Sequence, residues 1–328
     1  MIYSDFMTIL FNEIKDKKKI SDSTATAYLR VLYKLNNDEP FNNLNFIKNK
    51  DEIINKISGL KADNTKKMYL GAICSILGLE RFKSKPFMKA KQAYYSLMMD
   101  YAKAHNEEEI KNEKTEKQRI NWLNYEDIIK TRDELKDKIK DNVKTEKQYN
   151  DLLNYLILSL YTYILPRRNL DYNIMVLNFD NKPQDTNKNY LILKKDNEKF
   201  IFNKYKTSKS DDNKNETPEE RENRRTVKIE SFELLKIIHT YFFNHPLIKG
   251  KPTKKHEGLP FLVYYDGRPF INNSITRVLN RIFKKNIGSS MLRHIIASYK
   301  GGEDLKELKQ RAQEMGHSLD QHIQYIKK

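Results

Sequence analysis

Cysteine is nearly absent from this sequence of 328 residues, in which Cys74 is the only one. Neither a disulfide nor a cysteine-based zinc site can therefore form within one chain, which indicates a reducing compartment. A signal-peptide pattern is missing too, because the amphipathic N-terminal segment 1–10 soon gives way to lysines. Long apolar runs are lacking: the longest, Tyr155–Pro166, falls short of the about 20 residues that span a bilayer. These absences predict a soluble intracellular protein without a membrane partner.

The signatures of several enzyme classes are also missing. The sequence contains no P-loop, no His-Glu-x-x-His pair, no Gly-x-Gly-x-x-Gly turn and no cluster of acidic residues suited to a metal ion. We therefore expect no cofactor and no metal site.

Acidic residues are outnumbered by basic ones. The chain has 61 Lys and Arg against 44 Asp and Glu, a formal net charge of +17 and a pI near 9.5. Lys and Arg that neutralise phosphates release counterions and bind nucleic acid of any sequence, so this excess favours a polyanionic partner. The abundance of Asn, Lys and Ile offers a second explanation, an AT-rich genome such as that of a virus or mobile element. Charge alone leaves both explanations open.

The N-terminal part, residues 1–104, is predicted to be an all-helical domain. Apolar residues recur at helical spacing from Ala27 to Leu35, and the polar segment Ser21–Thr24 before them is a helix-start signal. No strand-like alternation occurs in this part. Further helices are expected at 51–60, 64–79 and 90–104. Residues 105–118 are highly charged and are interpreted as a linker or as the solvated end of a long helix.

The remainder, residues 119–328, is predicted to be an α+β domain. Segments 189–195 and 199–205 alternate around a turn at Asp196-Asn197, and 225–229 is expected to be a third short strand. The polar stretch 208–224 is expected to be a mobile loop. Helices framing a small antiparallel sheet define the α+β class. They are expected at 126–139, 149–164, 232–243, 271–284, 290–299, 303–315 and 319–327.

Four short motifs bear groups suited to phosphate chemistry: Pro166-Arg167-Arg168-Asn169-Leu170-Asp171, Leu292-Arg293-His294, Gly316-His317 and Tyr325. Transfer of a phosphodiester places negative charge on the non-bridging oxygens, and preorganised donors aimed at them are often the largest catalytic contribution. Arginine suits this task because its planar fork binds two phosphate oxygens and keeps its proton. Tyrosine can act as a nucleophile and split the transfer into two easier steps.

This order of arginine, arginine-histidine, glycine-histidine and tyrosine resembles the tyrosine recombinase, or phage-type integrase, family. The resemblance covers the C-terminal two-thirds by motif and the N-terminal third only by general character. It implies a helical core-binding domain (1–104), a linker (105–118) and a mainly helical catalytic domain with a small antiparallel sheet (119–328). These are expected to close as a C-shaped clamp on double-stranded DNA. The implied activity is site-specific recombination or integration through a 3′-phosphotyrosyl intermediate, without metal or ATP.

The first arginine of the family pattern is followed by an acidic residue at the third position and an apolar residue at the seventh. Arg168 fits, with Asp171 and Met175 at those positions, while Arg167 fits less well and stays an alternative. The resemblance assigns Arg168 to the phosphate. It makes Asp171 an orienting partner for an arginine rather than a base.

The second arginine of the pattern is Arg293. The histidine that the family usually has three residues earlier is replaced by Ser290, whose hydroxyl can donate to a phosphate oxygen but is a poorer proton acceptor. His294 is expected to give structural support. His317 would hydrogen-bond a non-bridging oxygen, and it precedes Tyr325 by eight residues, one fewer than is usual in the family.

Tyr325 is the nucleophile that the resemblance implies. A phenol has a pKa of about 10, so its attack at neutral pH needs proton removal or a strongly cationic pocket. A general acid must protonate the departing 5′ oxygen, and the family uses a lysine on a β-hairpin, often followed by threonine. Lys206, which precedes Thr207, fits this role, and Lys204 and Lys209 are near alternatives.

Other interpretations remain open. A type IB topoisomerase shares this chemistry but cleaves one strand as a monomer, whereas a recombinase synapses two sites as a homo-oligomer, a dimer or tetramer on DNA. Recombinases usually carry a further helix after the tyrosine, yet only Ile326–Lys328 follow Tyr325, so either the natural chain continues or assembly uses another surface. Ser290 suggests a DNA-binding protein without catalysis, and a helical signalling protein with a chance motif set is a last alternative. The expected location is wherever the target DNA lies: cytoplasm, nucleus or a viral factory.

Overall fold

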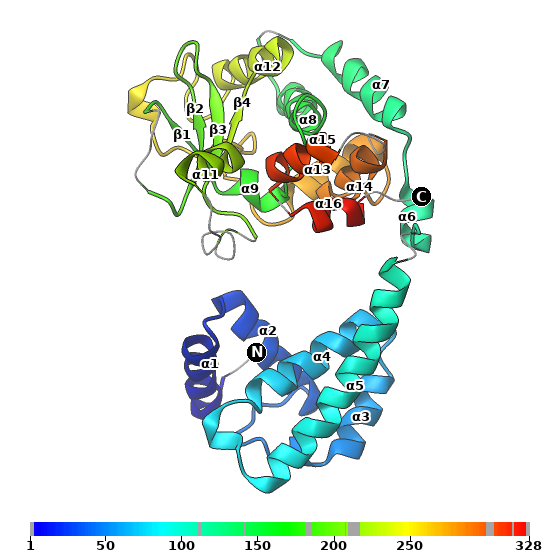
Figure 1. The fold of residues 1–328 in the computed structure, drawn as a ribbon. Coiled ribbons are helices and arrows are strands. Elements are labelled where there is room, and N and C mark those ends of the chain that lie inside the picture. Colours follow the sequence, from blue (N-terminus) through cyan, green and yellow to red (C-terminus); the bar gives the residue numbers. More distant parts are fainter. Residues whose placement is uncertain are drawn as a thin grey trace. The chain divides into compact units, whose positions relative to one another are not determined.

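The computed structural model describes residues 3–110, 113–140, 142–180, 185–206, 208, 217–299, 305–316 and 318–325. The chain divides into two compact units, Met1–Lys111 and Asn112–Lys328 (Figure 1). Helices dominate both units, and the second also contains a small sheet of four strands. The predicted α+β class is therefore confirmed.

The first unit is a set of helices around one apolar core. Ser4 and Ser21 each accept a hydrogen bond from a backbone N–H in the following turn, which sets where the first two helices begin. Leu29 is fully buried, and Tyr94 donates its hydroxyl to the Ile47 carbonyl oxygen inside the core at 2.6 Å. The elements are α1 (Asp5–Lys18), α2 (Asp22–Leu35), η1 (Asn45–Lys48), α3 (Lys50–Ser58), α4 (Asp63–Ile76), η2 (Glu80–Phe82) and α5 (Lys85–Ile110).

Helix α5 extends into the segment predicted to be a linker. Residues 105–110 continue this helix, which is one of the two interpretations that the charged sequence allowed. A short helix, α6 (Glu116–Asn121), begins near the end of the same segment, where Thr115 and Gln118 form a capping box. Most of the described residues in the predicted linker, 105–118, are therefore helical.

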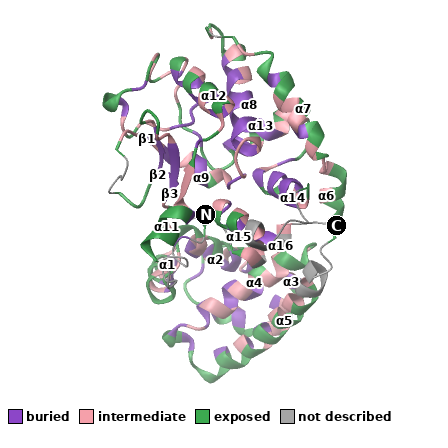
Figure 2. Cartoon of the chain, turned by 45° about the horizontal axis from the view of Figure 1, so that its top comes forward, coloured by how far each residue is buried: buried purple, intermediate pink, exposed green. Residues whose placement is uncertain are grey.

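The second unit combines its sheet with many helices. They are α6, α7 (Tyr125–Lys136), α8 (Glu146–Thr162), α9 (Asn169–Asn173), α11 (Pro218–Arg225), α12 (Phe232–Phe243), η3 (Lys254–His256), α13 (Ser274–Phe283), α14 (Ser289–Tyr299), α15 (Leu305–Glu314) and α16 (Leu319–Tyr325). Helix α8 contacts α7, α12 and α13. Every residue from Leu152 to Tyr161 is buried, so α8 is enclosed on all sides, and Figure 2 shows this concentration of buried residues.

No helix in the described part of the chain combines the length and apolar character needed to cross a membrane.

The sheet is mixed: the antiparallel pairing predicted for the three expected strands is confirmed, but the prediction of an entirely antiparallel sheet was wrong, because a fourth strand pairs in parallel. Its strands are β1 (Met175–Asn178), β2 (Asn189–Ile192), β3 (Lys199–Phe202) and β4 (Thr226–Lys228), in that spatial order. The pairs β2–β3 and β3–β4 are antiparallel, whereas β1 pairs with β2 in parallel, with Met175 opposite Asn189. Strand β1 reads Met-Val-Leu-Asn, a short apolar run without alternation, so a period of two did not reveal it. It also joins β2 through residues 179–188 rather than through a tight hairpin turn.

Helix α11 corrects the prediction of a mobile loop at 208–224. Thr217 and Glu220 form a capping box and Pro218 occupies the first turn, so helix-start signals were present in this polar sequence. Arg224 is buried, and the helix contacts β3 and α15. Apolar periodicity could not reveal a helix made almost entirely of Glu, Arg and Asn. Residues 209–216, also part of the predicted loop, lie outside the described residues.

Candidate functional site

The segment Arg167–Asp171 connects α8 to the short helix α9. Arg168 has an extended backbone as the N-cap of α9, and the Asp171 carboxylate accepts a hydrogen bond from the Arg168 N–H at 3.4 Å. The same carboxylate oxygen accepts from Arg167 Nε at 3.2 Å, which makes a buried ion pair. Burial raises the pKa of the Asp171 carboxyl, and the charges of Arg167 and Arg168 oppose that rise. One carboxylate thus fixes the side chain of one arginine and the backbone of the next.

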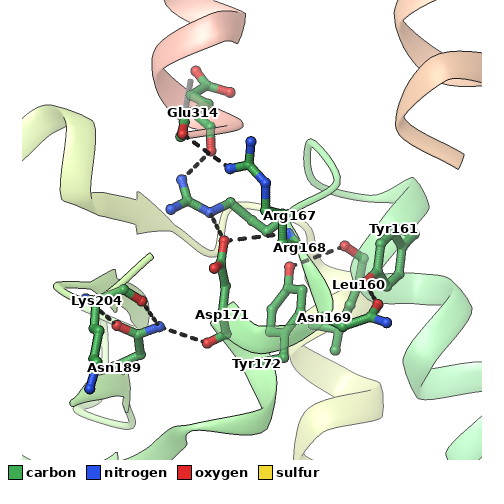
Figure 3. A network of polar contacts seen from close by, with 11 residues as sticks. Leu160, Tyr161, Arg167, Arg168, Asn169, Asp171, Tyr172, Asn189, Lys204 and Glu314 are labelled. Atoms are coloured by element: carbon green, nitrogen blue, oxygen red, sulfur yellow. Dashed lines mark hydrogen bonds and ion pairs between the residues drawn. The ribbon is translucent and has the colours of Figure 1, made fainter. Parts of the chain in front are cut away.

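Arg167 is enclosed by the protein and is 0% exposed. Its Nη1 donates to the Glu314 carbonyl oxygen at 2.7 Å, at the end of α15 (Figure 3). Its guanidinium carbon lies 4.0 Å from the ring centroid of Phe202 and 5.4 Å from that of Tyr205. Burial lowers the pKa of Arg167, and the neighbouring Asp171 opposes this shift. Arg167 therefore joins α9, the sheet and α15. Its Nη2, like Nε and Nη1 of Arg293, is buried without a hydrogen-bond partner among the described residues.

The turn after α15 is built on Gly316, which packs against Arg167. Gly316 has a φ of +73°, in the left-handed region that favours glycine. A Cβ at this position would lie 2.7 Å from Arg167 Nη2, closer than a side-chain carbon can approach. The next residue, the predicted phosphate ligand His317, lies outside the described residues.

Arg168 is half-buried, unlike its neighbour Arg167. Its Nη1 lies 3.5 Å from the Gly316 carbonyl oxygen, and its charge helps to lower the pKa of Arg293. The side chain therefore lies near both the turn at Gly316 and the second arginine of the motif set. Of the two alternatives for the first arginine, Arg168 is the one that solvent reaches.

Arg293, on α14, contacts the hydroxyl of Tyr325, the last residue of α16. Its Nη2 donates to the Tyr325 hydroxyl oxygen at 2.7 Å, and its guanidinium carbon lies 4.8 Å from the ring centroid. Arg293 is 3% exposed, and its Nε and Nη1 have no hydrogen-bond partner among the described residues. Burial lowers the pKa of Arg293, but an arginine remains charged at neutral pH. A buried guanidinium with unused donors beside a hydroxyl is suited to binding an anion.

His294 and Ser298, on the same helix, hold the backbone of Tyr325. His294 Nδ1 lies 3.1 Å from the Tyr325 carbonyl oxygen, and because a carbonyl oxygen only accepts, Nδ1 carries the hydrogen in this contact. The Ser298 hydroxyl donates to the same oxygen at 3.5 Å. The rings of His294 and Tyr325 also pack together, with centroids 4.5 Å apart. Two consecutive residues of α14 thus contact Tyr325: Arg293 bonds its hydroxyl and His294 bonds its main chain.

Ser290 is exposed in the first turn of α14. It precedes Arg293 by three residues, so both side chains lie on adjacent parts of one helix face. The Ser290 hydroxyl is therefore accessible one turn away from the buried guanidinium of Arg293.

Lys206, the predicted general acid, is exposed just beyond β3. It lies in a turn in which the Ser208 N–H donates to the Tyr205 carbonyl oxygen at 3.0 Å. Tyr205 itself points inward and is 4% exposed. Thr207 and the alternative Lys209 lie outside the described residues. Lys206 follows the end of β3 by four residues, and Phe202, the last residue of that strand, packs against Arg167.

Asn189 is a buried residue of this region that the sequence interpretation missed. It is 0% exposed at the first position of β2. Its Nδ2 donates to the carbonyl oxygens of Asp171, at 2.8 Å, and of Lys204, at 2.9 Å, and its Oδ1 accepts from the Lys204 N–H at 2.8 Å (Figure 3). The one available signal was an asparagine in a strand that otherwise reads Tyr-Leu-Ile.

Metal binding has no support from the described side chains. Among them, no three or more His, Cys, Asp or Glu residues lie close enough together to hold a metal ion. The polar groups of the site are instead dominated by the arginines 167, 168 and 293.

Comparisons with known proteins add no family to this description. A scan against protein-family models and searches of curated proteins and of solved structures return no match. The motifs and contacts described above are therefore the basis on which a function can be proposed.

Proposed function

We propose that this protein is a DNA strand transferase of the tyrosine recombinase kind, a site-specific recombinase or integrase. The observation that carries the proposal is the 2.7 Å contact between Arg293 Nη2 and the Tyr325 hydroxyl. Two other donors of the same buried guanidinium have no partner among the described residues. A phosphate bound by those donors would lie next to the nucleophilic oxygen.

The proposed step exchanges one phosphoester bond for another. The Tyr325 hydroxyl oxygen attacks the phosphorus of a DNA phosphodiester, the new O–P bond forms and the bond from phosphorus to the 5′ oxygen breaks. The phenolic proton passes to solvent, and the Lys206 ammonium gives a proton to the departing 5′ oxygen. Because the 3′-phosphotyrosyl bond conserves the energy of the broken ester, rejoining by a 5′ hydroxyl needs no ATP and no metal.

Arg168, Arg293 and His317 are the proposed ligands of the non-bridging phosphate oxygens. The accessibility of Arg168 and its electrostatic effect on Arg293 support its role over that of Arg167. Arg167 and Asp171 would support the site from within, and Ser290 would add a hydroxyl donor at its edge.

Double-stranded DNA is the proposed partner. The net charge of +17 supports it, because Lys and Arg that replace condensed counterions bind the phosphate backbone. In this proposal the helical unit and the catalytic unit close as a C-shaped clamp around the duplex. Phosphate contacts would set the register and base contacts the choice of site. Recombination would also need a homo-oligomer, a dimer or tetramer, on DNA inside the cell.

The first test needs no knowledge of the target site. Wild-type protein is mixed with a fragmented DNA library in EDTA, the reaction is quenched with SDS, and protein-linked DNA is isolated and its ends sequenced. Tyr325→Phe should abolish the covalent product and leave DNA affinity nearly unchanged, because only the nucleophilic oxygen is removed. Tyr265→Phe is the matched control, since Tyr265 is an exposed tyrosine of the same unit with no place in the proposed site.

The outcomes separate the alternatives. Product that persists at the wild-type level in Tyr325→Phe would refute the assigned nucleophile. Attached ends that contain paired inverted repeats would support a recombinase, and a short single motif would support a type IB topoisomerase. A wild-type yield no higher than that of Tyr325→Phe would favour a DNA-binding protein without catalysis.

A further inference from the structure

We infer that Asn189 is a positioning residue that holds the segment of Lys206 in register with the segment of Arg168. The inference rests on the proposed function, because it concerns the general acid and a phosphate ligand of that reaction. It adds a residue that none of the sequence motifs contains.

The carboxamide of Asn189 bonds to two separate segments of the chain. Through Nδ2 it reaches the Asp171 carbonyl oxygen in α9, whose N-cap is Arg168. Through Nδ2 and Oδ1 it also bonds both backbone groups of Lys204, two residues before Lys206. One side chain therefore fixes the distance between the two segments, as Figure 3 shows for Asp171, Asn189 and Lys204.

The Asn189 side chain continues the pairing of β2 and β3 where the backbone ladder stops. The last backbone partners are Asn189 and Phe202, and beyond them the Lys204 N–H and C=O pair with the carboxamide instead of with a strand. This holds Lys204 beside the sheet, so that Tyr205 turns into the interior and Lys206 stays exposed. Loss of the carboxamide would leave the Asp171 carbonyl oxygen and both backbone groups of Lys204 without these partners.

Only an amide of this length supplies two N–H donors and one acceptor at this point. Aspartate has the same shape but no donor when ionised, and it would place a negative oxygen against the carbonyl oxygens of Asp171 and Lys204. Asn189→Asp should therefore release the Lys204 segment. The helices and the apolar side chains of the sheet are not altered by this change.

The test compares leaving groups that do and do not need a proton. It thereby distinguishes a displaced general acid from a general loss of activity. A duplex with the sequence recovered from wild-type adducts is prepared in two forms, with oxygen or with sulfur at the bridging 5′ position of the cleaved phosphate. A thiolate is a much weaker base than an alkoxide, so sulfur departs without a proton from Lys206. A displacement of the general acid should therefore slow cleavage of the oxygen substrate and spare the sulfur substrate.

We expect Asn189→Asp to slow cleavage of the oxygen substrate by up to about 10²-fold, the size of effect that a misplacement of about 1 Å can have. Lys206→Ala should slow it by about 10²- to 10⁴-fold, the usual contribution of general acid catalysis. With the sulfur substrate, both variants should cleave at close to the wild-type rate. Asn189→Ser, which keeps a shorter donor and acceptor, serves as a second variant if Asn189→Asp does not fold.

Asn203→Asp is the matched control. Asn203 lies next to Lys204, and its Nδ2 donates to the Lys188 carbonyl oxygen at 3.1 Å at the exposed side of the same strand pair. This variant should cleave both substrates as the wild type does. The inference is overturned if a folded Asn189 variant cleaves the oxygen substrate normally, or if it loses activity equally on both substrates. Failure of the wild-type protein to attach to any DNA would instead overturn the proposed function, and the inference with it.

Discussion

At the scale of single residues, two consecutive arginines have different surroundings and different expected tasks. Arg167 is fully buried in an ion pair with Asp171 and bonds the Glu314 carbonyl oxygen, whereas Arg168 is half-buried at the N-cap of α9. Spacing in the sequence favoured Arg168 for the phosphate. It could not show that Arg167 is internal, because Glu314 is 147 residues away along the chain.

Alanine at these two positions should therefore have opposite consequences. Arg167→Ala leaves the Asp171 carboxylate buried without its partner, which costs about 3–5 kcal/mol of stability. Arg168→Ala should leave the thermal unfolding midpoint close to that of the wild type and lower covalent DNA attachment by about 10²- to 10³-fold, as expected for the loss of a charge-stabilising donor. Thermal unfolding and attachment per folded molecule measure both effects. A larger loss of attachment for folded Arg167→Ala than for Arg168→Ala would contradict the assignment.

The candidate site was predictable in its residue types and in their order, but its contacts were not. The motifs selected Arg293, His294 and Tyr325, and the structure brings these three together. Sequence alone could not show that Arg293 bonds the hydroxyl while His294 bonds the backbone, because both contacts depend on how α14 packs against α16. Asn189 was missed because its role depends entirely on backbone groups far away in the sequence.

At the scale of elements, the clarity of the apolar pattern determined which helices and strands could be predicted from the sequence. Helices α8 and α12 carry several turns of apolar residues and were predicted nearly at their observed bounds. Helix α9 contains five residues, too few to establish a helical period, and strand β1 is an apolar run without alternation, so both were missed. Helix α11 is long enough but polar throughout, so its cap residues were the only evidence for it. The parallel pairing of β1 with β2 is a non-local contact that no local pattern contains.

The turn between α15 and α16 gives a test at this scale. Gly316→Ala should lower the free energy of unfolding in two ways, through about 1–2 kcal/mol of left-handed strain and through the collision with Arg167. Covalent DNA attachment should also fall, because the same turn leads to His317. Gly258→Ala is the control: its φ is +81°, and an added Cβ would meet nothing within 4 Å, so only the strain applies. Equal losses of stability in chemical denaturation of the two variants would show that the Arg167 contact does not constrain the turn.

At the scale of the whole molecule, global stability should depend on pH through His245. This residue follows α12, is 0% exposed, and its Nδ1 accepts a hydrogen bond from the Leu247 N–H at 3.2 Å. Burial lowers the pKa of His245 to about 4, below the about 6.5 of a histidine in the unfolded chain. Between these values the unfolded state binds more protons, so the free energy of unfolding must fall as the pH falls.

We expect His245 to reduce stability by about 2 kcal/mol when the pH falls from 7.5 to 5. The difference between urea unfolding curves of the wild type and of His245→Gln at the two pH values isolates this contribution, because other titrating groups are common to both proteins. His239→Gln, on the exposed face of α12, is the control and should follow the wild type. An identical pH dependence of wild type and His245→Gln would show that His245 is not responsible.

The contact between Arg293 and Tyr325 lies within one chain, so we expect cleavage in the proposed reaction to occur in cis. Each copy would use its own tyrosine and its own arginine, so each copy would contain one complete active site. In a mixed population the number of attached strands would then decrease in direct proportion to the fraction of Tyr325→Phe copies. A mixture of Tyr325→Phe and Arg293→Ala should show no covalent DNA attachment, because neither variant contains both residues in one chain.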